Sequence, residues 1–155
     1  MTPIRLVVVD DHMVFREGLR ALLGRVDDIE IVGEAANTQD AVEVTEALRP
    51  DVVLMDLNLP GDGGEAATTT ILAAHPEVAV LVLTMHSDDA HLRHALQAGA
   101  RGYLLKDAEP DAIIRAILAV HEGQAIFDPG IAARVIAATG TPQADRRYVV
   151  LYGLH

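Results

Sequence analysis

Four apolar runs in this sequence, each typical of a buried parallel strand, stop at residues that carry chemistry. The runs are Ile4–Val9, Val52–Met55, Val78–Leu83 and Gly102–Leu105. Directly after them stand Asp10 and Asp11, Asp56, Thr84 and Lys106. Parallel strands place their carboxyl ends on one edge of a sheet, and open α/β sheets bind ligands at that edge. The sequence therefore predicts one pocket that gathers three carboxylates, a hydroxyl and an ammonium group.

Strand-like and helix-like segments alternate from Ile4 to about Glu122, which is the pattern of repeated βαβ units around a parallel sheet. Spacing and capping residues predict helices over about 14–25, 38–49, 65–75, 92–99 and 110–121, and a further strand over 29–35. The fourth helix is polar and rich in alanine, so we expect it to pack loosely and to move. The predicted fold class is α/β.

The length of the chain predicts one main domain. Its 155 residues are about the size of a single domain, which we place at residues 1–124. We expect a short helical extension over 125–138, with its helix over 131–138, and a linker and tail over 139–155. The apolar tail from Tyr148 to His155 is compatible with a docking strand, the start of another domain, or a non-native addition.

Composition excludes several classes of function. The formal net charge of −11 would repel a nucleic-acid backbone, and five aromatic residues are too few for a platform that stacks bases. The sequence has no cysteine, so oxygen and imidazole are the strong metal ligands that remain. No apolar run approaches the roughly 20 residues that cross a bilayer, and no signal segment is recognisable. We therefore expect a cytoplasmic protein that does not contact a membrane.

Three carboxylates in one cleft repel one another unless a cation lies among them. Oxygen ligands with room for several waters suit Mg²⁺ or Mn²⁺ better than zinc. We expect Asp10 and Asp11 to bind the metal, and Asp56 both to touch it and to offer an oxygen nucleophile to phosphorus. Lys106 and Thr84 would each contact a phosphoryl oxygen and stabilise charge in the transition state. This constellation favours phosphoryl transfer.

Over about Ile4 to Glu122 the chain resembles the receiver domain of two-component response regulators, in particular the NarL/FixJ class. The stretches that carry the resemblance are Val8–His12, Met55–Gly61, Leu83–His86 and Gly102–Asp107. The resemblance implies a flavodoxin-like, doubly wound sheet of five parallel strands flanked by helices. It also implies a signalling switch that accepts a phosphoryl group from a sensor histidine kinase onto Asp56. Slow self-phosphorylation from small acyl phosphates and slow autodephosphorylation are then the only reactions expected.

The resemblance also implies how the metal is held. In the family, direct ligands are the residues that match Asp11 and Asp56, the match to Asp10 acts through water, and the backbone carbonyl at Asn58 completes the protein's set. No other cofactor is expected.

A two-state switch is the mechanism that the resemblance implies. Tyr103 matches the aromatic residue whose rotamer reports activation together with the threonine hydroxyl. A phosphoryl group adds about −1.5 to −2 charge, Thr84 would move toward it, and the fourth helix and Tyr103 would repack. Asn58 and His86 match positions that flank the incoming water, so we expect them to tune the lifetime of the phosphoryl group.

Two residues depart from the commonest family pattern. Met85 follows Thr84 where small residues are common, which predicts narrower access to the phosphoryl site. Asp107 follows Lys106 where proline is frequent and its peptide is cis. A cis peptide without proline costs about 3 kcal/mol, so we expect this loop to be trans or strained.

The output of the switch is expected to lie outside this chain. Regulators of the NarL/FixJ class usually carry a carboxyl-terminal helix-turn-helix domain, so DNA contact and control of transcription are expected only through such a domain. Homodimerisation on phosphorylation is also expected. The alternative is a stand-alone receiver that signals by protein contacts.

Two other protein classes use similar sheets. A haloacid-dehalogenase-like phosphatase needs its nucleophile on the first strand and a second aspartate two residues later, but His12 stands two residues after Asp10 and Asn58 two after Asp56. A flavodoxin needs a hydroxyl-rich phosphate loop after the first strand, where Asp10 and Asp11 would repel phosphate. Both classes are therefore less favoured.

Overall fold

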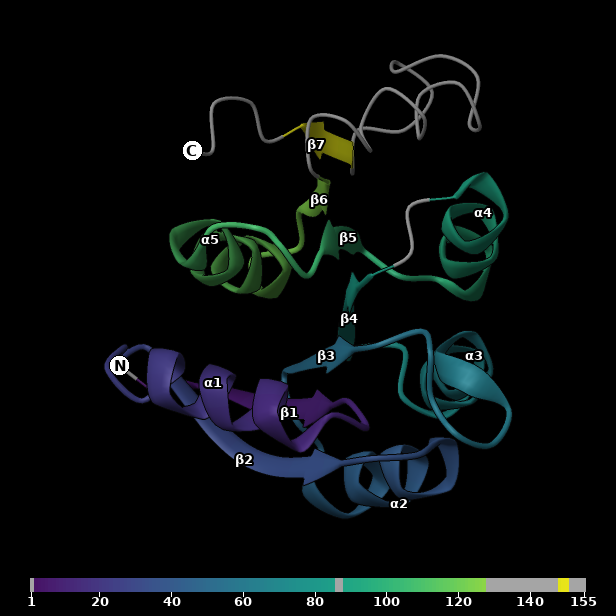
Figure 1. Cartoon of the computed structure of the whole chain (residues 1–155), viewed down its shortest axis with the longest axis horizontal. Coiled ribbons are helices and arrows are strands. Elements are labelled where there is room, and N and C mark those ends of the chain that lie inside the picture. The colour runs from purple at the N-terminus through teal and green to yellow at the C-terminus, as the bar shows by residue number, and fades with distance from the viewer. Residues whose placement is uncertain (1, 86–87, 128–147, 151–155) are drawn as a thin grey trace.

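The computed structural model of the protein describes residues 2–85, 88–127 and 148–150, and these form one parallel sheet with helices on both faces (Figure 1). The strands are β1 (Ile4–Val9), β2 (Ile29–Ala35), β3 (Val52–Met55), β4 (Ala79–Thr84), β5 (Gly102–Leu105), β6 (Ala125–Phe127) and β7 (Tyr148–Val150). The helices are α1 (Met13–Leu23), α2 (Thr38–Leu48), α3 (Gly63–Ala74), α4 (Asp89–Ala98) and α5 (Pro110–His121).

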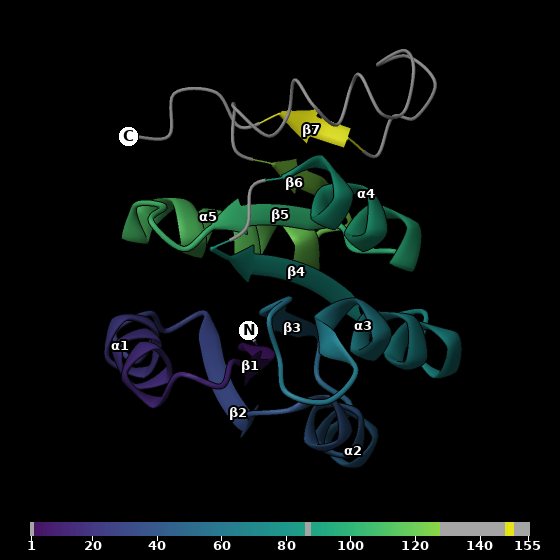
Figure 2. The ribbon, with the colours of Figure 1, turned by 45° about the vertical axis from the view of Figure 1, so that its right-hand side comes forward.

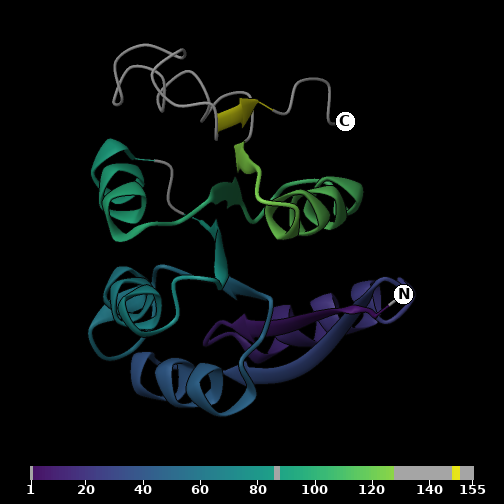
Figure 3. The same ribbon diagram turned by 180° about the vertical axis from the view of Figure 1, so that it is seen from behind.

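The strands lie in the order β2-β1-β3-β4-β5-β6-β7, and every pair is parallel. Helices α1 and α5 cover one face of the sheet, and α2, α3 and α4 cover the other, as the front and back views show (Figures 1 and 3). The strand order changes direction between β1 and β3. Crevices outside the carboxyl ends of strands at such a reversal are where open α/β sheets bind ligands.

Both faces of the central strands are apolar because helices cover both of them. On the α1 and α5 side, Leu6 and Leu54 of the sheet pack in one cluster with Leu19 of α1 and Ile117 of α5. On the opposite side, the sheet residues Val53 and Val80 share a second cluster with residues of α2 and α3. A third cluster joins α4 to β4, β5 and β6. Figure 2 shows β4 and β5 side by side in this region.

The predicted flavodoxin-like order of five strands is confirmed, but the described sheet has two more strands than predicted. Residues 125–127, expected to begin a helical extension, form β6, which pairs with β5. The run is too short to show a period, and Gly123, with φ +94°, turns the chain after α5 so that Ile126 and Phe127 can join the sheet. The expected helix over 131–138 lies outside the described residues.

The described part of the tail is a strand. Residues Tyr148–Val150 form β7, which pairs with β6 in the register Ala125 to Tyr148 and Phe127 to Val150. These three residues therefore extend the sheet by one strand.

Helix α4, which we expect to pack loosely and to move, contacts the core through two buried residues. Leu92 and Ala95 are each 1% exposed and pack in the third cluster with Tyr103 and Phe127. Gly99, with φ +106°, ends the helix in the left-handed conformation that glycine tolerates. In the described part of the chain, no helix has the length and apolar character needed to cross a membrane.

Helices α2 and α3 are joined by an ion pair between Glu46 and the buried His75. The hydrogen bond from the His75 ring and its charge lower the pKa of Glu46 below its ordinary value, against a smaller opposing effect of burial. A carboxyl group with a depressed pKa stabilises the fold above its unfolded-state pKa, and this contribution is lost as the pH falls through the folded-state pKa. The pair should therefore stabilise the protein at neutral pH and lose its effect in acid.

We expect Glu46→Gln to unfold at a slightly lower urea concentration than the wild type at pH 7, with the difference vanishing as the pH falls below the range of a free glutamate. Urea midpoints measured from pH 7 to pH 3 test this. Glu43→Gln, an exposed glutamate on the same helix, is the matched control and should show no such trend. A difference for Glu46→Gln that is constant across the range would contradict the role of the pair.

Candidate functional site

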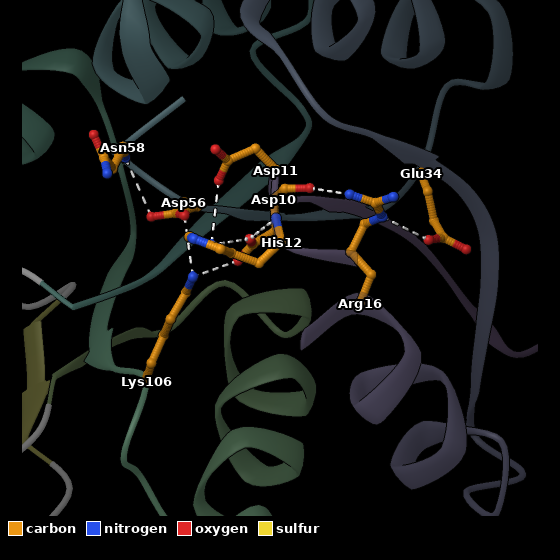
Figure 4. Close-up of polar contacts among 8 residues, drawn as sticks. All are labelled: Asp10, Asp11, His12, Arg16, Glu34, Asp56, Asn58 and Lys106. Atoms are coloured by element: carbon orange, nitrogen blue, oxygen red, sulfur yellow. Dashed lines mark hydrogen bonds and ion pairs between the residues drawn. The ribbon is translucent and has the colours of Figure 1, made fainter. Parts of the chain in front are cut away.

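The side chains that follow β1, β3 and β5 converge at the carboxyl edge of the sheet, as predicted (Figure 4). Val9 and Met55 are paired in neighbouring strands, and the Asp56 N–H donates to the Val9 carbonyl at 3.0 Å. This register places Asp10 beside Asp56. Both aspartates are only 2% exposed, so two carboxylates lie almost out of contact with bulk water.

Lys106 reaches between these two carboxylates (Figure 4). Its Nζ lies 2.6 Å from Asp10 Oδ2 and 3.1 Å from Asp56 Oδ2, and its side chain is 7% exposed. Burial lowers the pKa of Lys106, but hydrogen bonds to Asp10 and Asp56 and their charges outweigh that effect, so the pKa is raised above its ordinary value. The ammonium therefore stays charged at neutral pH and binds both aspartates together.

Four potential metal ligands lie close together in the site. Asp10, Asp11, His12 and Asp56 each offer one atom, and these atoms all lie within 4.8 Å of one another. Three carboxylates and the ammonium of Lys106 formally leave two negative charges, which a divalent cation would balance. Carboxylate oxygens are the ligands that Mg²⁺ prefers, so the residues present fit the predicted metal.

Backbone groups hold the carboxylates in place. Asp10 Oδ1 accepts from the His12 N–H at 2.8 Å, and Asp56 Oδ1 accepts from the Asn58 N–H at 3.2 Å. The loop after β3 folds tightly over Asp56: a Cβ at Gly64 would lie 2.2 Å from the Asp56 carbonyl oxygen. Only glycine fits at this position, and the close approach keeps Asp56 at the start of the loop that carries Asn58.

Arg16 of α1 supports the site from the side of the first strand (Figure 4). Its Nη1 donates to the Asp10 backbone carbonyl, and its Nε donates to Glu34 at 3.1 Å. Glu34 of β2 also pairs with Arg20. This network ties α1 to β2 and fixes the backbone from which Asp10 and Asp11 project.

Thr84 and Tyr103 are fully buried near the site. Thr84 ends β4, and its carbonyl accepts from the Lys106 N–H at 2.8 Å, so the hydroxyl-bearing residue and the lysine share one ladder of the sheet. Tyr103 packs in the third cluster beside Leu92 of α4. Tyr103 and α4 therefore share one apolar cluster.

The structure describes both residues that depart from the family pattern, Asp107 and Met85. The Lys106–Asp107 peptide is trans, which is one of the two expected conformations. Met85 is 74% exposed. His86, expected to tune the phosphoryl lifetime, lies outside the described residues.

Sequence reasoning missed three residues of this site: His12, Phe15 and Arg16. The His12 ring lies 3.2 Å from both Asp10 Oδ1 and Asp11 Oδ1, and Phe15 contacts Lys106. Adjacency to the acidic pair was a usable signal for His12. Phe15 lies within the helix predicted over about 14–25, which by itself indicates no contact with the site. Arg16 carried no signal because the group of the site that it contacts is a backbone carbonyl.

Comparisons with known proteins agree with this geometry. The family model described as the response regulator receiver domain matches residues 6–118. The transcriptional regulatory protein DegU of Brevibacillus brevis is 40% identical over 133 residues, which cover 86% of this chain and 56% of DegU. The chain thus spans little more than half the length of that relative.

Two solved structures are similar in fold and sequence. A LuxR-family two-component response regulator from Aurantimonas sp. SI85-9A1 superposes with a TM-score of 0.83 at 36% identity, covering 89% of this chain and 99% of that one. A receiver domain from Mycobacterium tuberculosis named for the response regulator NarL gives 0.77 at 35% identity, covering 80% and 100%. The chain therefore belongs to the receiver-domain family of two-component response regulators, among relatives of the NarL/LuxR class.

Proposed function

We propose that this receiver domain is a phosphorylation switch in which Asp56 accepts a phosphoryl group from a histidine of a sensor kinase. The observation that carries the proposal is the arrangement around Asp56. Its carboxylate is buried beside the ammonium of Lys106, and it lies within 4.8 Å of the other carboxylates that could hold a divalent ion.

In the transfer step, one carboxylate oxygen of Asp56 forms the new bond to phosphorus, and the bond from phosphorus to the donor's imidazole nitrogen breaks. The nitrogen leaves with the electron pair of that bond. Lys106 Nζ lies 3.1 Å from Asp56 Oδ2, so it would contact one oxygen of the phosphoryl group as that group is transferred. The Thr84 hydroxyl would donate a hydrogen bond to another phosphoryl oxygen. The protein contributes mainly position and positive charge.

A divalent ion, Mg²⁺ or Mn²⁺, would be held by Asp11, Asp56 and the Asn58 carbonyl, with Asp10 acting through water. When bound, the ion supplies positive charge that offsets the repulsion between the carboxylates and an incoming phosphoryl group. Asp11 is the more exposed of the adjacent pair, at 30% against 2% for Asp10, so it can take a ligand position without breaking the ion pairs of Lys106.

The new charge on Asp56 would be read out through Thr84, Tyr103 and α4. A phosphoryl group competes with Asp56 and Asp10 for Lys106, and Thr84 would move toward it. Because Val82 of β4, Tyr103 of β5 and Leu92 of α4 lie in one apolar cluster, a shift of β4 would change the packing of α4. The surface that carries α4 would then pair with a second copy of the chain.

Control of transcription through a separate helix-turn-helix domain is the proposed output. The support is that the similar protein DegU is described as a transcriptional regulatory protein, and the chain covers 56% of it. A stand-alone receiver that signals by protein contacts is the alternative.

Intact-mass measurement after incubation with acetyl phosphate tests the proposal. We expect the wild type to gain one phosphoryl group when Mg²⁺ is present and none when the metal is chelated by EDTA. Absence of labelling with Mg²⁺ would contradict the proposed switch. Multiple turnover of phosphate esters would instead favour a phosphatase, and a yellow protein with bound flavin would favour a flavodoxin.

Asn58 and His86 are proposed to tune how long Asp56 stays phosphorylated. The Asn58 N–H donates to Asp56 Oδ1 at 3.2 Å, and Asn58 matches a position that flanks the incoming water in the family. We expect Asn58→Ala and His86→Ala each to change the autodephosphorylation rate by roughly two- to tenfold, which is less than the loss of a full general acid or base would cause. Decay of the labelled protein followed by mass spectrometry measures the rate, and unchanged decay in both variants would refute the assignment.

A further inference from the structure

The ring of Phe15, on the first turn of α1, lies beneath the ammonium of Lys106. Lys106 Nζ is 4.6 Å from the centroid of the ring. This distance is within the range of an attractive cation–π contact. We infer that Phe15 is a positioning residue for Lys106, an inference that rests on the proposed role of Lys106 in phosphorylation of Asp56.

Three groups together surround the ammonium: Asp10 Oδ2 at 2.6 Å, Asp56 Oδ2 at 3.1 Å and the Phe15 ring. Lysine has a flexible four-carbon stem, so a fixed position requires contacts on more than one side. Cation–π attraction increases when water is excluded. Because the Lys106 side chain is only 7% exposed, its attraction to the Phe15 ring should be strong.

The ring is itself held by the core. Phe15 packs against the cluster on the α1 and α5 side of the sheet, and it lines a small pocket with Leu19 and Leu83 beside Asp10 and Asp56. It therefore forms the apolar floor of the site, and its position is set by the packing of α1 rather than by the lysine.

A ring suits this role better than another hydrogen-bond acceptor. During transfer the ammonium must exchange part of its contact with Asp56 for a phosphoryl oxygen. A third carboxylate would compete with the phosphoryl group for the three N–H donors, whereas the face of a ring attracts the cation without occupying a donor in a fixed direction. Phe15 can thus hold Lys106 in reach of Asp56 while its other partners change.

Fluorination of the Phe15 ring tests this role with little change in size. Fluorine withdraws charge from the face of the ring, so one, two and three fluorine atoms should progressively weaken the attraction for a cation. With fluorinated phenylalanines placed at position 15, we expect the rate of Asp56 labelling by acetyl phosphate to fall stepwise, by roughly three- to tenfold across the series. Phe15→Trp should retain the rate of the wild type, and Phe15→Leu should match the low end of the series.

The same fluorinated residues at Phe127 are the matched control, because Phe127 is the other phenylalanine of the chain and is buried in the cluster around α4. The Phe127 series should leave the rate unchanged. A flat response at Phe15, or an equal response at both positions, would overturn the inference.

A second measurement examines the contact without any reaction. Lys106 is the only lysine in the sequence, so ¹³C-labelled lysine gives its side-chain NMR signals without assignment. The ring current of Phe15 should shift the NMR signals of the Lys106 ε-CH₂ protons upfield in the wild type and not in Phe15→Leu. If the wild type shows no such shift, Phe15 does not position Lys106. If this shift is present but the wild type is never labelled, the proposed function fails while the contact stands.

Discussion

Replacement of Asp56 by asparagine is expected to abolish labelling of the protein by acetyl phosphate. Asparagine keeps the shape of the side chain and can still accept the hydrogen bond from the Asn58 N–H, but an amide is too weak a nucleophile to attack phosphorus. Intact mass should show no added phosphoryl group under conditions that label the wild type fully. Asp62→Asn, an exposed aspartate just before α3, is the matched control and should be labelled normally.

A remaining label on Asp56→Asn would assign the acceptor elsewhere. The variant is not expected to unfold, because Lys106 keeps its ion pair with Asp10 at 2.6 Å. A normal circular dichroism spectrum together with lost labelling therefore separates a missing nucleophile from a damaged fold. Loss of label in both Asp56→Asn and Asp62→Asn would contradict the specific role of Asp56.

Replacement of Lys106 by methionine is expected to lower the free energy of unfolding by about 3 kcal/mol in the absence of divalent metal. Removal of one partner from a buried ion pair leaves uncompensated charge, and such losses are typically about 3 to 5 kcal/mol. Here the removed ammonium forms ion pairs with two aspartates that are each 2% exposed. Urea denaturation at pH 7 measures the change.

The pH dependence of this loss has a definite sign. Because the pKa of Lys106 is raised by Asp10 and Asp56, its contribution is fully present below the pKa of an unfolded lysine and is lost as the pH rises through the folded-state value. The difference between wild type and Lys106→Met should therefore persist at neutral pH and shrink only in strong alkali.

Two controls make the Lys106 result specific. Mg²⁺ should stabilise Lys106→Met more than it stabilises the wild type, because the ion replaces the missing positive charge. Arg93→Met, which removes an exposed cation from α4, should change stability by less than about 0.5 kcal/mol. A Lys106→Met variant as stable as the wild type would show that the buried carboxylates do not depend on the lysine.

The convergence of Asp10, Asp56 and Lys106 was predictable because it follows from chain direction. Parallel strands put their carboxyl ends on one edge, so a residue that follows an apolar run is placed by the run itself. The boundaries of β1, β3 and β5 were predicted to the residue for the same reason: each run is bounded by polar or turn-forming residues.

The contacts inside the pocket were less predictable, because they depend on how far side chains reach rather than on strand order. Nothing in the spacing indicates that Lys106 binds Asp10 as closely as it does, or that Phe15 lies beneath its ammonium. The contact with Phe15 depends on how α1 packs against the sheet. Likewise β6 is a three-residue strand that exists because β5 offers an edge, so only the tertiary structure reveals it.

The location of the phosphoryl group after reaction with acetyl phosphate and Mg²⁺ tests the central claim most directly. Borohydride reduces an aspartyl phosphate to homoserine, and peptide sequencing by tandem mass spectrometry then identifies the modified residue. We expect homoserine at position 56 alone. Homoserine at position 10 or 11, or a phosphoryl group found on a histidine or hydroxyl side chain, would contradict Asp56 as the acceptor.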